Sequence, residues 1–437
     1  MNAETGSSLI NRLEPHPLRE ELYGELHARP TPLLDGPLRA SHVVFQNTLE
    51  EMAESQAHVA RLAKRYGTSG PVPDANHYIG NFGGFELRWE RHTEFCAFTV
   101  VRPGCGEDPF ADPAIGLLPE DWVEAIPGHL VVACHAAIME AGRPQPDAED
   151  LNQWFEGQLL AGSRISGGRA SVWTTFRMHR DGFGRYLIGD HGLSPFQAGR
   201  TLQRLLDLET YRVMSLMALP VARKLAPETT RLDSELATIM DQFMSIGSPE
   251  DERRLLEQLS GLAATAEHHR AKTNYRFGAT RAYYSLVTSI IENLREEHFP
   301  GMSSLGKFLD RRLTPGVRTC LAMENRLENL SQRVGRAGEL LQARISVGIE
   351  TQNQTLLSAM NRRSGMQLRL QQTVEGLSVA AISYYSVALL KILFDSLENA
   401  GVPIRPHLAT GIALPIVVIG VWALVRRIRH SLDKEPS

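Results

Sequence analysis

Two long apolar segments near the C-terminus constrain the fold of this chain more than any other feature. Residues 374–394 carry two charges, Glu375 and Lys391, each close to one end, and residues 408–425 carry none. Because about 20 helical residues cross the hydrocarbon core of a bilayer, both segments are long enough to span it. The short linker DSLENAGVPIRPH contains turn formers, so we predict a transmembrane hairpin; the alternative is a buried helical hairpin in a soluble protein. The predicted parts are a first span at 373–394, a short external loop at 395–407, a second span at 408–426 and a cytosolic tail at 427–437.

The placement of arginines predicts the orientation of this hairpin. Basic residues next to a span tend to remain on the cytosolic side. Three arginines precede the first span, three follow the second and one lies in the loop: Arg362, Arg363 and Arg369; Arg426, Arg427 and Arg429; and Arg405. The N-terminal segment lacks the continuous apolar core of a signal peptide. We therefore expect both termini in the cytosol and the loop on the far side.

Four polar residues of the first predicted span fall on one helical face: Glu375, Ser378, Tyr385 and Ser386. Polar groups are costly in lipid and normally face protein or water. One interpretation is a stripe that lines or gates a pore. The other is a contact between the two spans, in which this face packs against the small residues Ala409, Gly411 and Ala413.

Residues 38–194 have a mixed pattern that predicts an α+β domain. Runs rich in β-branched and aromatic residues indicate strands, including GPLRASHVVFQNT, a hairpin that turns around His92 and Thr93, and two strands joined at RDGFG. The segments LPEDWVEA and AEDLNQWFE indicate short helices between strands. We expect a mainly antiparallel sheet, preceded by a helical or extended segment at 1–37.

After Pro195 the pattern becomes helical, and residues 195–372 are predicted to form a long-helix stalk. One helix begins after Ser248, a good N-cap followed by proline, and meets no strong breaker until FPG at 299–301. Such a helix would hold about 50 residues and measure roughly 75 Å. A second helix begins near Pro315 and approaches the first span.

The second long helix carries an apolar seam with the alternating spacing of three and four that is typical of a coiled coil. Its members are Cys320, Met323, Leu327, Leu330, Val334, Ala337 and Leu341. Beyond Leu341 the spacing shifts to Ile345, Ile349, Leu356 and Met360. The seam predicts self-association through the stalk, although pairing with the helix after Pro249 would use the same residues.

No catalytic or metal-binding motif emerges from the sequence. It lacks the GxSxG, HExxH, Walker and paired CxxC patterns. Its 46 basic and 50 acidic residues nearly cancel, which disfavours nucleic acid as a partner. Four scattered cysteines, Cys96, Cys105, Cys134 and Cys320, indicate reduced thiols. We therefore predict no enzymatic activity, no cofactor and no metal.

Two polar stretches nevertheless supply candidate site residues. In HPLREELYGELHARP, the residues His16, Glu21, Glu25 and His27 could share a metal or a proton, or could belong to a solvated amphipathic helix that docks on a partner domain. In RWERHTEF, the residues Arg88, Glu90 and His92 alternate along a strand and so share one face. They would form either a cross-strand ladder of ion pairs or a binding site.

Three stretches taken together carry a resemblance: HPLREELYGELHARP; RWERHTEF followed by GRTLQRLLDLETYRVMSLMALPVAR; and VEGLSVAAISYYSVALLK. They resemble a family of bacterial proteins catalogued as uncharacterised and membrane-anchored, whose domain of unknown function covers nearly the whole chain. The resemblance implies a location in the bacterial inner (cytoplasmic) membrane and no established activity.

The layout is also similar to that of the CorA-type magnesium transporters, which combine a cytosolic α/β domain, long helices and two C-terminal spans with both ends inside. In that family the first span lines a pentameric pore and ends in a Gly-Met-Asn filter. The corresponding end of this chain reads FDSLENAG, without that filter. The likeness implies a shared layout and no shared ion.

These features lead to hypotheses of different classes. The leading one is a non-enzymatic inner-membrane protein that forms a homo-oligomer in the lipid bilayer, with a divergent CorA-like channel or transporter as one form of it. The alternative is a membrane-tethered binding or scaffold protein without conduction. A third is an enzyme that uses the polar N-terminal surface. The sequence indicates no particular ion or small-molecule ligand.

Overall fold

The computed structural model describes residues 13–19, 22–23, 31–245, 247–399, 403 and 405–432. These residues form two compact units. The first holds the residues up to Ser245 together with Glu257–Ala337, and the second holds Ile246–Leu256 together with the chain from Gly338 onward.

The first unit is built around a mixed sheet with the strand order β2-β3-β4-β1-β5-β8-β7-β6-β9 in the described part of the chain. The strands are β1 (Leu38–Gln46), β2 (His77–Asn81), β3 (Glu86–Arg91), β4 (Phe95–Pro103), β5 (His129–Ile138), β6 (Ala161–Ile165), β7 (Ala170–Thr174), β8 (Gly184–Asp190) and β9 (Glu297–His298). Strands β5 and β8 pair in parallel, and the other neighbouring pairs are antiparallel. The predicted α+β class is confirmed, as are the hairpin at His92 and the strands joined at RDGFG.

One face of the sheet is covered by α3 (Leu49–Arg65). A capping box between Thr48 and Glu51 starts this helix by satisfying backbone N–H groups that would otherwise lack partners. Its buried residues include Val59 and Leu62, which belong to one core with aromatic residues of β3 and β4. Short segments follow at η1 (Ala114–Leu117), α4 (Glu120–Glu124) and α5 (Ala148–Trp154), and the last two confirm the predicted short helices.

Helix α6 (Pro195–Met214) packs on the opposite face of the sheet. Ser194 caps it with Gln197 in a capping box, and Pro195 occupies the first turn. Its leucines share a core with Ala40, Ala136 and Ile188 of the sheet. The boundary predicted at 194/195 therefore divides residues that bury one another, and α6 lies on the sheet instead of in a stalk.

The strand β9 and the helix α9 (Leu305–Arg312) also join the sheet from within the predicted stalk. Strand β9 pairs with β6 at the sheet edge. With two residues it has no periodicity that could reveal it from sequence. The stalk prediction is corrected at this point, because the chain returns to the sheet before the second long helix begins.

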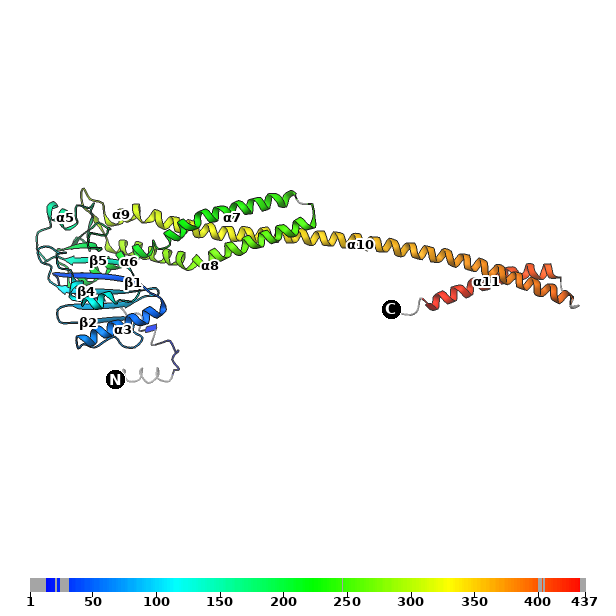
Figure 1. The fold of residues 1–437 in the computed structure, drawn as a ribbon, viewed down its shortest axis with the longest axis horizontal. Coiled ribbons are helices and arrows are strands. Elements are labelled where there is room, and N and C mark those ends of the chain that lie inside the picture. The colour runs from blue at the N-terminus through cyan, green and yellow to red at the C-terminus, as the bar shows by residue number, and fades with distance from the viewer. Residues whose placement is uncertain are drawn as a thin grey trace, which may run out of the picture. The chain divides into compact units, whose positions relative to one another are not determined.

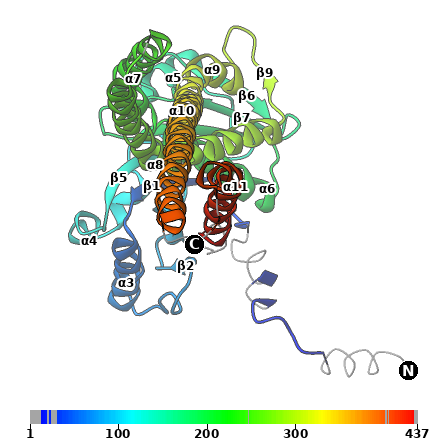
Figure 2. The same cartoon turned by 90° about the vertical axis from the view of Figure 1, so that its right-hand side faces the viewer.

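Three helices extend from the sheet side by side: α7 (Leu219–Ser245), α8 (Pro249–Leu294) and the first part of α10 (Thr314–Asn399) (Figures 1 and 2). Cys320, Met323 and Leu327 of the seam pack with residues of α7 and α8, among them Leu225 and Phe277. The rest of the seam is buried as well: Leu330, Val334, Ala337 and Leu341. Its first residues thus pair within the chain, as the alternative expected, and this part of the seam is not available to hold an oligomer.

The second unit contains the remainder of α10 and the helix α11 (Pro406–Leu432), which lies alongside the end of α10 (Figures 1 and 2). Helix α10 continues beyond the predicted end of the first span at residue 394 and reaches Asn399. The sequence DSLEN contains neither glycine nor proline, so nothing in it stops the helix. The predicted loop at 395–407 is shorter by these residues.

Candidate functional site

The two C-terminal helices remain exposed along their apolar segments. The most apolar window of α10 has 6% of its residues buried inside the chain, and that of Pro406–Arg427 has 0%. A core helix of a soluble protein would have most of such a window covered. By length and composition both helices are able to cross a membrane.

The four polar residues predicted to form a stripe on the first span differ in how far they are exposed. Glu375 and Ser386 are half-buried, whereas Ser378 and Tyr385 are exposed. The Ser378 hydroxyl donates to the carbonyl oxygen of Val374 at 2.8 Å, so its own helix satisfies it. On α11, Ala409 and Ala413 are half-buried and Gly411 is exposed. Packing between the spans thus accounts for part of the stripe, and the rest faces away from the hairpin.

Ser383 is a buried serine of this hairpin that was not among the residues predicted from the sequence. Ser383 is 6% exposed, and its Oγ has no hydrogen-bond partner among the described residues. It lies two helical turns after Glu375, and this spacing was the signal that could have placed it on the packed face.

A pocket of about 480 Å³ opens between the β3–β4 turn and the helices α6 and α8. It is lined by Asn76, Arg91, His92, Thr93, Tyr211, Tyr283 and Leu286. The rings of Tyr211 and Tyr283 stack with centroids 5.7 Å apart, and the His92 ring stacks on Phe95 at 4.2 Å. Arg91 donates to Asn76 Oδ1 at 3.1 Å and 2.7 Å. The pocket therefore combines an aromatic wall with several hydrogen-bonding groups.

Beside this pocket lies a buried carboxylate, Glu94, that our sequence reasoning did not single out. It is 7% exposed, accepts a hydrogen bond of 2.7 Å from the Tyr283 hydroxyl and forms an ion pair with Arg276. Burial, together with the hydrogen bond to this carboxylate, raises the pKa of Tyr283 far above its usual value. Glu94 thereby ties the β3–β4 turn to α8. An acidic residue in a tight turn between two strands was the signal that could have drawn attention to it.

The alternating charges of RWERHTEF do not form the predicted cross-strand ladder. Arg88 is buried and pairs with Glu86 of its own strand at 2.6 Å. Its neighbours across the sheet are Ile79 and Thr99, which carry no charge. Glu90 is half-buried in the same strand, whereas His92 follows the end of β3 and enters the pocket instead. The three residues therefore do not make one site.

The N-terminal candidates are placed only in part. His16 is exposed, and its Nδ1 accepts a hydrogen bond of 3.2 Å from the backbone N–H of Leu18. Glu21, Glu25 and His27 lie outside the described residues.

Several buried histidines have structural partners. His42 Nε2 lies 3.0 Å from Thr210 Oγ1, which itself donates to the Leu206 carbonyl, and His42 Nδ1 lies 2.8 Å from Thr99 Oγ1. This geometry assigns the proton to Nε2 of a neutral ring. Burial lowers the pKa of His42 to about 4, and likewise those of His58 and His135.

The structure offers no obvious metal site in its described part, where no three histidine, cysteine or acidic side chains gather as metal ligands. Cys96, Cys105, Cys134 and Cys320 are all buried as free thiols. Burial raises the pKa of each thiol, which makes them poor nucleophiles.

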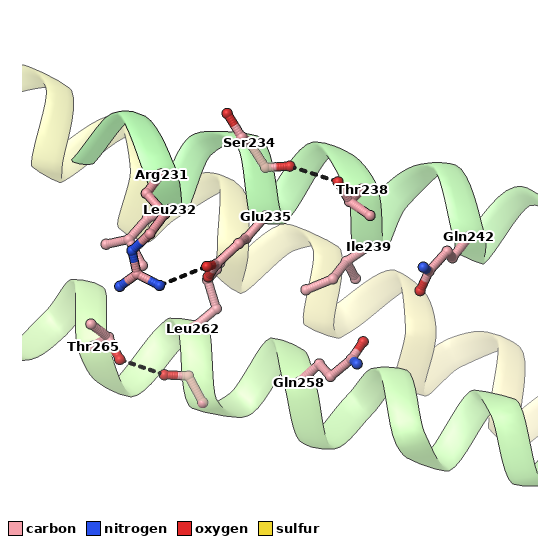
Figure 3. A pocket seen from close by; sticks show the side chains of 11 residues that line it. Arg231, Leu232, Ser234, Glu235, Thr238, Ile239, Gln242, Gln258, Leu262 and Thr265 are labelled. Carbon is pink, nitrogen blue, oxygen red and sulfur yellow. Dashed lines mark hydrogen bonds and ion pairs between the residues drawn. The ribbon is translucent and has the colours of Figure 1, made fainter. Parts of the chain in front are cut away.

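A second pocket, of about 620 Å³, is a groove between α7 and α8 (Figure 3). Buried Leu232, Ile239 and Leu262 form its apolar part. Arg231 and Glu235 form an ion pair of 2.7 Å at its rim, and small or uncharged polar side chains make up the rest of the lining (Figure 3). Such a groove suits an apolar chain or a helix face better than a charged ligand.

Comparison with known proteins gives one match. The profile of a family described as "Protein of unknown function (DUF3422)" matches residues 14–432. No curated protein and no solved structure matches the chain, and neither comparison supports the CorA-type layout.

Proposed function

Because the chain belongs to the DUF3422 family of proteins of unknown function, we propose a function from its own residues: a membrane-anchored binding protein without enzymatic activity. In this proposal α10 and α11 cross the bacterial inner membrane as a hairpin, and the sheet-containing unit lies in the cytosol. The family description leaves the activity open, and the exposed apolar helices and the pockets support the proposal.

The observation that carries the proposal is the exposure of the two apolar helices. Large apolar side chains stay uncovered along both, including Leu389 at 67%, Ile412 at 66% and Ile416 at 66%. Covering one such side chain is worth about 1.5–3 kcal/mol. A continuous surface of this kind on a soluble protein would cause aggregation, whereas hydrocarbon covers it at no cost.

Arginines at the ends of the hairpin support the orientation. Three precede the first span and three follow the second. The Arg426 guanidinium lies over the Trp422 ring, 5.0 Å from its centroid. An aromatic ring beside a cation is the arrangement expected at the level of lipid headgroups, where both groups anchor the end of a span.

The pocket beside Glu94 supports binding instead of catalysis. It presents the side chains of Arg91, His92 and two tyrosines, a set that suits a small polar or anionic ligand. The buried cysteines and the neutral histidines described above do not line it. We therefore assign the binding role to this pocket.

Two measurements test the anchoring. The chain should stay in the membrane pellet after an alkaline wash that removes peripheral proteins. A reporter active only in the cytosol should be active when fused at Met1 or after Ser437 and silent at Gly401. A reporter active only outside the cytosol, fused at the same positions, should give the opposite pattern. An active cytosolic reporter at Gly401 would mean that the hairpin does not cross the bilayer.

Conduction is the second candidate, favoured by the exposed polar residues Ser378 and Tyr385 on the first span. If these side chains line water, Ser378→Cys should react with a membrane-impermeant thiol reagent. The native cysteines are buried, so they should give little background. Protection of Ser378→Cys and Ser386→Cys, with labelling of Tyr384→Cys by a lipid-soluble reagent, would leave the tethered binding protein alone.

A further inference from the structure

A long part of α10 has no packing partner among the described residues. Every residue from Ser346 to Val374 is exposed, a length of about 40 Å. Helices in proteins owe most of their stability to packing of an apolar face, and along this part of the helix the apolar side chains are left uncovered. Gly348 and Gly365 weaken it further, by about 1 kcal/mol each relative to alanine. Further contacts would therefore stabilise this segment, and the part of the chain that the structure describes supplies none.

An apolar stripe, which we call the stalk stripe, runs along this segment and continues to Leu377 in the first predicted span. Its members are Ile349 (55% exposed), Leu356 (56%), Met360 (63%), Met366 (68%), Leu370 (67%) and Leu377 (70%). Ile349, Leu356, Leu370 and Leu377 follow one another at multiples of seven residues, and Arg363 fills the vacant place in that series. A strict repeat of seven produces the left-handed supercoil of a coiled coil. Val374, 58% exposed, lies four residues after Leu370 and extends the same face, whereas three other exposed apolar residues, Val347, Leu357 and Leu368, lie off the stripe.

We infer that the stalk stripe is covered by the stalk stripe of a second copy of this chain, parallel and in register. The inference rests on the proposed anchoring. Because each copy crosses the same membrane with its own hairpin, the α10 helix of every copy leaves the bilayer in the same direction. A parallel arrangement then places each member of the seven-residue series opposite itself. The membrane anchoring also confines the copies to two dimensions, which raises their effective concentration.

The charges of the segment are compatible with a like copy. Arg363, at a central place in the stripe, can lay its aliphatic stem along the neighbouring leucine and keep its head in water. A polar residue at such a place costs stability but specifies register and strand number. Arg362 and Arg369 precede the first span, where anionic headgroups would balance them.

Cysteine cross-linking in membranes tests the inference. Leu356→Cys and Leu370→Cys, as single changes, should each form a disulfide-linked dimer on mild oxidation. Gln354→Cys and Gln372→Cys lie on the opposite face of the helix and serve as matched controls, expected to give little dimer. The native cysteines are buried and should not contribute. Dimer at both stripe positions identifies a parallel pair, because an antiparallel pair could bring at most one of them together.

Charge substitutions sharpen the test. Leu356→Asp in the Leu370→Cys chain should lower the dimer fraction severalfold, whereas Gln354→Asp should leave it unchanged. Arg363→Leu should raise the fraction that survives in detergent. Equal cross-linking at stripe and control positions, in a chain that an alkaline wash leaves in the membrane, would overturn the inference. A cross-link to a different protein would also overturn it. Release by the wash would instead refute the proposed anchoring.

Discussion

The ion pair between Glu94 and Arg276 should contribute strongly to the stability of the sheet-containing unit. Glu94→Gln keeps the shape of the side chain and an acceptor for Tyr283 but removes the charge that balances Arg276. The Arg276 side chain is 16% exposed and that of Glu94 is 9% exposed. Water can therefore solvate the unpaired Arg276 guanidinium only slightly. Removing one partner of a buried pair costs about 3–5 kcal/mol. Because Arg276 retains some contact with water, we expect about 3 kcal/mol.

Denaturant unfolding of the purified full chain in detergent measures this cost. Trp89, Trp122, Trp154 and Trp173 are all buried in the sheet-containing unit, so intrinsic fluorescence reports its unfolding. Glu90→Gln, at a half-buried position in the same hairpin, is the matched control, and its effect should stay within about 0.5 kcal/mol.

A double-mutant cycle separates the ion pair from other effects. Arg276→Met alone should be costly because it leaves the Glu94 carboxylate buried without a cation. Combined with Glu94→Gln, the two changes should cost at least about 1 kcal/mol less than the sum of the single changes. Additive costs, or a cost below about 1 kcal/mol for Glu94→Gln, would refute the reasoning.

Two further predictions concern pH and two glycines. Burial lowers the pKa of His42 from 6.5 to about 4, so between these values the unfolded chain binds more protons than the folded chain. The contribution of His42 to the free energy of unfolding is complete above pH 6.5 and decreases toward pH 4 by up to about 1.4 kcal/mol per pH unit. His42→Gln should therefore make the free energy of unfolding less dependent on pH across this range. A Cβ at Gly199 would lie 1.8 Å from the backbone oxygen of Pro32, whereas one at Gly261 would meet no atom within 4 Å. Gly199→Ala should therefore destabilise by about 1–3 kcal/mol, and Gly261→Ala should stabilise its helix by about 0.5–1 kcal/mol; the opposite order of unfolding midpoints would contradict this.

Local signals in the sequence were sufficient for the main elements. Ser194 and Pro195 mark the start of α6, Ser248 and Pro249 that of α8, and both helices begin at these residues. The turn at His92 separates β3 from β4 as predicted. The apolar segments were recognisable as potential spans because length and a low number of charges are properties of the segment itself.

The tertiary structure decided what covers each apolar face and which charges meet. Periodicity shows that Cys320 and Leu327 share a face, but not that α7 and α8 of the same chain bury it. In the same way, β9 becomes a strand only because the sheet edge at β6 is there to pair with it. Glu94 and Arg276 are 182 residues apart, and no local pattern connects them. His92 and Arg88 alternate along the sequence, yet the end of β3 falls between them and places them in different surroundings. Local preference depends on neighbours within a few residues, whereas burial and ion pairing depend on groups that the fold brings together. The main helices and strands were therefore determined by the sequence alone, whereas β9 and the sites were decided by the tertiary structure.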